Sequence, residues 1–173
     1  MKIILKPIGD FDKNVPEELK GRLKQTFGCP VEIALEDYNL EKAYDSKRKQ
    51  YLATKLLSQL KKAGVAKGEK VLGIVDVDLY APGLNFIFGQ ADITAGTAAI
   101  SLCRLRQEYY GSATDDVLFL DRTTKEAVHE LGHTFGLEHC SNAKCVMHFS
   151  NSLSDTDLKQ AAFCSRCRPK LIK

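Results

Sequence analysis

The chain has 173 residues, of which 44% are hydrophobic and 27% are charged, and it is long enough for one compact domain with a sizeable core. Its formal net charge of +3 is too small to argue for binding to nucleic acid or to a membrane surface, and no stretch approaches the roughly 18 consecutive apolar residues that span a bilayer. The apolar run at residues 3–5 is too short for a secretory signal, so we expect a cytoplasmic protein whose six cysteines are metal ligands or buried thiols rather than disulfides.

The first half of the chain alternates strand and helix patterns. Leu19, Leu23 and Phe27 recur at helical spacing, whereas residues 70–78 (KVLGIVDVD) are almost continuously apolar and β-branched, as in a buried central strand. The predicted elements are a strand over 2–8, a helix over 16–27, a strand over 31–35, a helix over 47–63 and a strand over 70–78. This order predicts a twisted sheet with parallel strands.

The second half adds the helix that carries most of the chemistry. It should begin through residues 117–120, with Asp121 or Thr123 as its N-cap. Glu126 lies three residues beyond Thr123, which is the pattern of a capping box. The remaining predicted elements are a strand over 86–91, a strand over 93–104 and a last helix over 154–163.

Metal-binding side chains are concentrated at residues 129–147, which read HELGHTFGLEHCSNAKCVM. His129 and His133 are four residues apart, so on a helix they share one face and can point both rings at one metal ion. Glu130 is turned by about 100° around the helix, where it can act as a general base toward a water at that metal. The H-E-x-x-H spacing therefore predicts a metal site with an acid–base residue beside it.

A third ligand follows the helix. Gly136 can adopt the left-handed conformation that ends a helix, after which the chain turns and brings His139 to the same metal. Three protein ligands leave a fourth position for water, which is typical of a catalytic rather than a structural zinc. The alternative is a helix with surface histidines and a glycine cap. Together with Met147, the string H-E-x-x-H-x-x-G-x-x-H resembles the metzincin clan of zinc metalloproteases, in which the methionine forms a turn beneath the metal.

Four of the six cysteines form a second pattern. Cys140 and Cys145 make one close pair, and Cys164 and Cys167 make a C-x-x-C pair, which is the spacing of a four-cysteine structural zinc site. The histidine directly before Cys140, the C-x4-C-x-M run and the distant C-x-x-C together resemble the archaemetzincin family. This resemblance implies two zinc ions per chain, a catalytic one bound by His129, His133 and His139 and a structural one bound by Cys140, Cys145, Cys164 and Cys167.

The resemblance also implies a fold. The class is α/β (α+β), with a metzincin-like twisted mixed β-sheet that has one antiparallel edge strand, two packing helices, an active-site helix and a small zinc-stapled C-terminal subdomain ending in a helix. We expect a single catalytic domain over residues 1–173. Its upper subdomain, 1–136, would include the active-site helix, and its lower subdomain, 137–173, would hold the methionine turn and the four-cysteine zinc site.

The same resemblance suggests where a substrate would lie. In metzincins the antiparallel edge strand follows the active-site cleft, and an open strand edge can pair with an extended peptide. Gly89, Gln90 and Ala91 are the candidates for that role here, although an ordinary edge strand would give the same pattern. Phe149, two residues after Met147, is a candidate for the wall of the side-chain pocket next to the zinc.

These features predict a zinc-dependent metallopeptidase that acts on peptide or protein substrates, with Glu130 as general base. The alternative is a low-activity peptide- or partner-binding protein in which both zincs are mainly structural, but a purely structural three-histidine site would not need Glu130. A nucleic-acid-binding zinc module is disfavoured because no basic, aromatic-rich patch accompanies the cysteines. We expect a monomer without a membrane partner. The substrate sequence and the roles of Cys29, Cys103 and His148 stay open.

Overall fold

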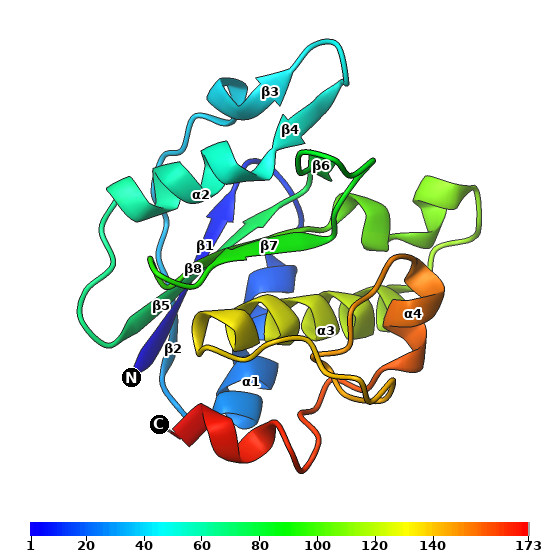
Figure 1. The fold of residues 1–173 in the computed structure, drawn as a ribbon. Coiled ribbons are helices and arrows are strands. Elements are labelled where there is room, and N and C mark those ends of the chain that lie inside the picture. Colours follow the sequence, from blue (N-terminus) through cyan, green and yellow to red (C-terminus); the bar gives the residue numbers. More distant parts are fainter. Residues whose placement is uncertain (173) are drawn as a thin grey trace.

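The computed structural model describes residues 1–172 and is built around a five-stranded mixed sheet (Figure 1). Across the sheet the order is β2-β1-β5-β8-β7. The strands are β1 (Lys2–Ile8), β2 (Val31–Ile33), β5 (Glu69–Val75), β7 (Gly89–Asp92) and β8 (Thr97–Ser101). Four of them are parallel, whereas β7 pairs antiparallel with β8 and forms one edge. The predicted mixed sheet with one antiparallel edge strand is confirmed.

Helices cover both faces of this sheet. The two helices α1 (Asn14–Phe27) and α3 (Asp116–Thr134) pack on one face, and α2 (Ala53–Lys62) packs on the other (Figure 1). Successive side chains of a strand point to opposite faces, so in β1 Ile3 and Leu5 join the core with α1 and α3, whereas Ile4 joins the core with α2. No helix within residues 1–172 is both long enough and apolar enough to cross a membrane.

A small second sheet changes the start of α2. The predicted helix over 47–63 begins only at Ala53, because β4 (Gln50–Leu52) is extended and pairs with β3 (Tyr44–Asp45) and β6 (Leu79–Tyr80). The backbone N–H of Tyr51 donates to the carbonyl of Asp78 at 2.8 Å. This long-range pairing overrides the helical spacing of the apolar residues at this point.

One predicted strand is longer than the strand in the structure. The strand expected over 93–104 is reduced to β8, because residues 93–96 form a turn that ends at Gly96 with a φ of 68°. Beyond Ser101 the chain enters short 3-10 turns. The 3-10 segments are η1 (Leu40–Ala43), η2 (Cys103–Leu105), η3 (Gln107–Tyr110) and η4 (Arg168–Ile172).

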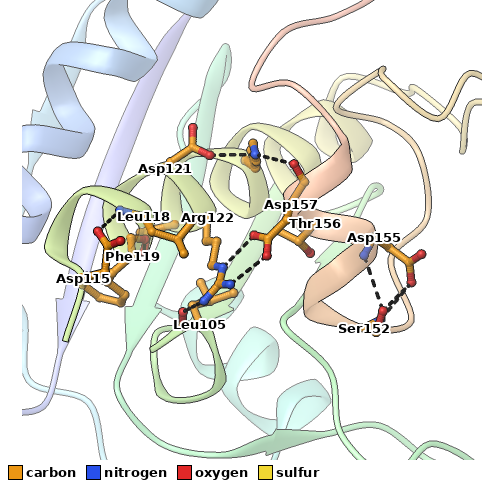
Figure 2. A network of polar contacts seen from close by, with 12 residues as sticks. Leu105, Asp115, Leu118, Phe119, Asp121, Arg122, Ser152, Asp155, Thr156 and Asp157 are labelled. Carbon is orange, nitrogen blue, oxygen red and sulfur yellow. Dashed lines mark hydrogen bonds and ion pairs between the residues drawn. The ribbon is translucent and has the colours of Figure 1, made fainter. Parts of the chain in front are cut away.

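The helix α3 starts earlier than predicted. Its N-cap is Asp115, whose side chain accepts a hydrogen bond from the backbone N–H of Leu118 at 2.9 Å (Figure 2). The predicted caps Asp121 and Thr123 lie within the helix, so those assignments were wrong. The capping box with Glu126 was wrong for the same reason, because by Glu126 the helix has already passed its first turns.

The C-terminal segment wraps under α3. Its helix α4 (Leu153–Leu158) is shorter than the predicted helix over 154–163 and begins with a capping box between Ser152 and Asp155 (Figure 2). The guanidinium group of Arg122 on α3 makes two hydrogen bonds of 2.7 Å to the carboxylate of Asp157 and one of 3.1 Å to the carbonyl of Leu105 (Figure 2). This bidentate pair fixes the C-terminal segment against the helix that carries the site.

Candidate metal centres

Two histidine side chains converge on one face of α3. The Nε2 atoms of His129 and His133 are 3.1 Å apart. The Nδ1 atom of His129 lies 2.8 Å from the carbonyl oxygen of Val146, and that of His133 lies 2.7 Å from the carbonyl oxygen of Leu137. A carbonyl can only accept, so each Nδ1 carries the hydrogen and each Nε2 keeps its lone pair for a metal ion.

The end of α3 brings in the third histidine. Gly136 has a φ of 83°, its N–H donates to the carbonyl of His133 at 2.8 Å, and the N–H of Leu137 donates to the carbonyl of Gly132 at 3.1 Å. These two bonds form a Schellman motif, which ends the helix and reverses the chain. One ligand atom from each of His129, His133 and His139 then lies within 4.8 Å of the others. The structure thus brings the three predicted ligands together.

The charge state of the imidazoles suits metal binding. Burial lowers the pKa of His129 well below its usual value, and it also lowers the pKa of His133 and of His139. Neutral imidazole is the form that coordinates a metal. A tetrahedral zinc with Zn–N bonds of about 2.0–2.1 Å places its nitrogens about 3.3 Å apart, close to the observed 3.1 Å. The donor set therefore fits zinc.

Glu130 is buried beside this site, against the edge strand. A Cβ atom built on Gly89 of β7 would lie 2.6 Å from Cγ and 2.9 Å from Oε1 of Glu130. Burial and the charge of Glu126 together raise the pKa of the Glu130 carboxyl to about 8, against the charge of Lys159, which lowers it. A cation held by the histidines would act in the opposite direction and favour the carboxylate.

A cavity lies next to His129 and Glu130. It is lined by the segment leading into β7, by α3 and by residues 149–151, which follow the methionine turn. Gly89 and Phe149, two of the predicted substrate-contacting residues, belong to this lining, and the Phe149 ring centroid is 4.9 Å from that of His139. Gln90 and Ala91 lie farther along the edge strand, outside the lining.

Met147 packs directly beneath the helix. A Cβ atom on Gly132 would lie 2.5 Å from its Sδ, so only glycine allows this approach. The methionine is fully buried, and its carbonyl accepts a hydrogen bond from the N–H of Cys140 at 2.9 Å. Gly132 was missed as a site residue, although a glycine between the two histidines of the helix was a visible signal.

The four predicted cysteine ligands form a second group. All four are free thiols, and their sulfur atoms lie within 4.8 Å of one another. The sulfurs of Cys140 and Cys164 are 3.8 Å apart. A tetrahedral zinc with Zn–S bonds of about 2.3 Å places its sulfurs about 3.8 Å apart, whereas a disulfide needs about 2.05 Å. This group also fits zinc.

Local donors favour a thiolate in this cluster. Burial acts against the charge, but the backbone N–H groups of Cys167 and Arg166 lower the pKa of Cys164 to about 6. The guanidinium of Arg166 also lies 3.8 Å from the sulfur of Cys140. Cys164 therefore begins to form a thiolate, the form that binds a metal, near neutral pH, whereas burial raises the pKa of Cys145 and of Cys167.

The other candidates stand apart from both groups. His148 is held locally, with its Nδ1 atom 3.0 Å from the carbonyl oxygen of Cys140. Cys29 is a buried free thiol of the core, and burial raises its pKa. Burial also raises the pKa of Cys103, to about 11. These three side chains do not belong to the two metal-binding groups found in residues 1–172.

A buried ion pair next to the site was not predicted. Lys159, whose side chain is fully buried, places its Nζ atom 2.9 Å from Oε1 of Glu126. Thr156 donates to the same oxygen at 3.1 Å. Glu126 stands one turn before Glu130 on α3, a spacing that was visible in the sequence, but nothing local indicated that Lys159 would be its partner.

Comparisons with known proteins show which sequences and folds the chain resembles. The family model for peptidase family M54 matches residues 4–173. An archaemetzincin from Pyrococcus furiosus is 47% identical over 177 residues, covering 98% of this chain and 91% of the relative. A zinc-dependent peptidase from Methanocorpusculum labreanum superposes with a TM-score of 0.90 at 32% identity, covering 98% of this chain and 99% of that structure. An archaemetzincin from Archaeoglobus fulgidus, crystallised in complex with malonate, gives a TM-score of 0.83 at 37% identity over 98% and 99% of the two chains.

Proposed function

Because the chain belongs to peptidase family M54, the archaemetzincins, and is a zinc metallopeptidase, we propose that it hydrolyses peptide bonds with Glu130 as general base. The observation that carries this proposal is the buried carboxylate of Glu130 beside three converging imidazoles, in the wall of a cavity. A purely structural three-histidine site would have no use for a buried acid at that position. Family membership supports peptides or proteins as the class of substrate.

We propose that His129, His133 and His139 hold the catalytic zinc. Bound there, zinc supplies a Lewis acid that acidifies water and polarises the scissile carbonyl. The chain prepares the site by fixing two imidazole rings through their Nδ1 hydrogen bonds to backbone carbonyls. Such bonds keep both Nε2 atoms aimed at one point.

Glu130 would move the proton. It takes a proton from the attacking water and passes it to the leaving amine, so one carboxyl group serves first as base and then as acid. Its position against the backbone at Gly89 leaves the side chain little freedom, and its burial limits access of bulk water. Both features keep the carboxyl oriented toward the reacting atoms.

A second zinc is proposed at the four cysteines. Four protein ligands leave no open position, so this metal would be structural. It would join the loop that carries Cys140 and Cys145 to the C-terminal pair Cys164 and Cys167. The metal would thus contribute folding energy to the segment beneath α3.

The edge strand β7 is the proposed docking site for the substrate backbone. Its outer side has no partner strand in the five-stranded sheet, and its first residue, Gly89, lines the cavity beside Glu130. An extended peptide could pair with the backbone of residues 89–91, as peptides do at other free sheet edges. Phe149 would then contact the side chain of the peptide next to the zinc.

The Glu130→Ala variant tests the mechanism. We expect it to keep the zinc content of the wild type but to lose about 100- to 10,000-fold in kcat, the usual contribution of a general base. Glu138→Ala, which removes an exposed carboxyl from the loop after α3, is the matched control and should retain activity. Full peptidase activity in Glu130→Ala would overturn the proposed role. A wild type that binds peptides tightly but cleaves none of them would favour the binding-protein alternative.

A further inference from the structure

The cavity beside Glu130 is lined in part by polar side chains, two of which we call the polar floor: Glu126 and Ser150. Glu126 precedes Glu130 by one helical turn, so the two carboxyl groups lie on the same side of α3. Glu126 is only 3% exposed, yet it lines the cavity. A buried carboxylate at the base of a cavity needs partners, because an unsatisfied buried polar group is costly.

The contacts of the Glu126 carboxylate are concentrated on one oxygen. Lys159 and Thr156 both contact Oε1, from the side of the C-terminal segment. Both contacts of this carboxylate within residues 1–172 go to Oε1, which leaves Oε2 able to accept a further hydrogen bond. The charge of Glu126 is balanced by Lys159, so the floor is neutral as a whole but retains a free acceptor.

A second polar atom of the cavity, on Ser150, has no partner within residues 1–172. The Oγ atom of Ser150 is buried and has no hydrogen-bond partner in the described chain. Ser150 lines the cavity from the segment after the methionine turn. Its hydroxyl can donate one hydrogen bond and accept others. The cavity therefore offers a free carboxylate acceptor and a free hydroxyl.

The wall formed by the segment that leads into β7 is apolar. Phe86 and Phe88 stack edge to face, with ring centroids 5.2 Å apart. The guanidinium of Arg104 lies 4.3 Å from the Phe86 ring centroid and is itself held by two hydrogen bonds to Asp78, of 2.6 and 2.7 Å. A ligand group would therefore enter a small preformed site between flat rings, with two polar atoms to satisfy.

A carboxamide fits this combination. Its NH2 group can donate to Oε2 of Glu126, and its carbonyl can accept from the hydroxyl of Ser150. An aliphatic side chain would leave both atoms unpaired. An ammonium group would add an uncompensated charge to a floor in which Glu126 is already balanced by Lys159. A carboxylate would meet Glu126 with a like charge.

The proposed mechanism indicates which substrate side chain enters the cavity. Glu130 gives its proton to the leaving amine, so that amine must lie against Glu130. The side chain nearest the cavity is then the one on the residue that follows the cleaved bond. We infer that the cavity selects a neutral carboxamide side chain, glutamine or asparagine, at this position. This inference rests on the proposed function.

Peptide libraries test this selection. A peptide mixture randomised around a central bond is cleaved by the wild type, and the residue after each cut is read by mass spectrometry. Glutamine and asparagine should be enriched about 10-fold over leucine, lysine and glutamate, because a site built to hydrogen-bond a group rejects the analogue that lacks it. Enrichment of leucine or lysine instead would overturn the inference.

Variants separate the polar floor from the fold. Ser150→Ala removes one of the two hydrogen bonds and should reduce the preference for glutamine over leucine about 3-fold, whereas the matched control Ser154→Ala, at an exposed serine of α4, should leave it unchanged. Glu126→Gln alone would leave the buried charge of Lys159 without a partner. The double variant Glu126→Gln/Lys159→Met removes both charges and is therefore measured beside Ser150→Ala. A glutamine preference that survives in both Ser150→Ala and the double variant would refute the assignment.

A binding measurement keeps this inference distinct from the proposed function. The zinc-loaded Glu130→Ala variant is titrated by calorimetry with two peptides that differ only in glutamine or leucine at the selected position. The glutamine peptide should bind about 10-fold more tightly. If the wild type cleaves no peptide, the proposed function fails, and the calorimetry still decides the selectivity. Equal binding of the two peptides would overturn the carboxamide assignment even if the enzyme is active.

Discussion

The contact between Gly89 and Glu130 makes a strong prediction about catalysis. Replacement of Gly89 by alanine would place a methyl group 2.6 Å from Cγ and 2.9 Å from Oε1 of Glu130. The methyl group cannot move the other way, because it would also lie 2.9 Å from the backbone oxygen of Ala99 on the neighbouring strand. The flexible partner is the glutamate, so we expect its carboxyl group to be displaced.

The magnitude follows from ordinary contact distances. Carbon atoms in contact prefer about 3.5–4.0 Å, so Cγ of Glu130 must retreat by about 1 Å. A displacement of this size in a reacting group can cost about 100-fold in rate. Overpacking of a well-packed region costs about 1–3 kcal/mol of stability, which a folded domain can absorb. Gly89→Ala should therefore fold, bind zinc and lose about 100-fold in kcat with a smaller change in KM.

A second glycine provides the control. A Cβ atom on Gly73 would lie 2.9 Å from Cδ1 of Leu60, on the α2 face of the sheet. Gly73→Ala therefore adds the same methyl group and a similar strain away from the site. Both variants are compared for kcat, KM, zinc content and thermal midpoint. If Gly89→Ala retains kcat within about 3-fold of the wild type, the reasoning about the position of Glu130 is wrong.

Three further predictions concern the segment beneath α3. Cys164→Ser should release the structural zinc, so metal analysis should find one zinc per chain fewer and calorimetry a lower thermal midpoint; an unchanged zinc content would contradict the four-cysteine site. Asp157→Ala leaves the guanidinium of Arg122, whose side chain is 5% exposed, without its carboxylate, and urea titration should show a loss of about 2–4 kcal/mol rather than a neutral change. The hydroxyl of Ser152 lowers the pKa of Asp155, so this carboxylate stabilises the fold above its unfolded value of 3.8 and the contribution is lost as the pH falls through the lower folded value. Denaturation between about pH 2 and 6 should show that dependence in the wild type and a weaker one in Asp155→Asn.

The convergence of the three histidines could be predicted because its geometry is local. His129 and His133 occupy successive turns of one helix, and Gly136 ends that helix at a fixed distance from both. Within eleven residues, helical periodicity and one left-handed glycine decide where the side chains go. The same holds for the buried strand around Leu72, whose apolar run can satisfy its backbone only within a sheet.

Contacts between distant segments could not be predicted. Tyr51 continues the apolar spacing of α2, but its backbone is extended because it bonds to Asp78 of another segment. Glu126 fits the local pattern of a capping box, yet its partner is Lys159, 33 positions away in the chain. Sequence patterns report periodicity and local capping, whereas these interactions are decided by which elements meet in the folded chain.

The two metal groups depend on each other through one loop. His139 and Cys140 are neighbours in the chain but belong to different groups. The loop between them and Met147 is closed by the bond from the N–H of Cys140 to the carbonyl of Met147, and Val146 bonds both to His129 and to Ala162 of the C-terminal segment. A metal at the cysteines would therefore hold the backbone on which His139 depends. The cysteine cluster would thus help to position His139 in addition to fixing the C-terminal segment.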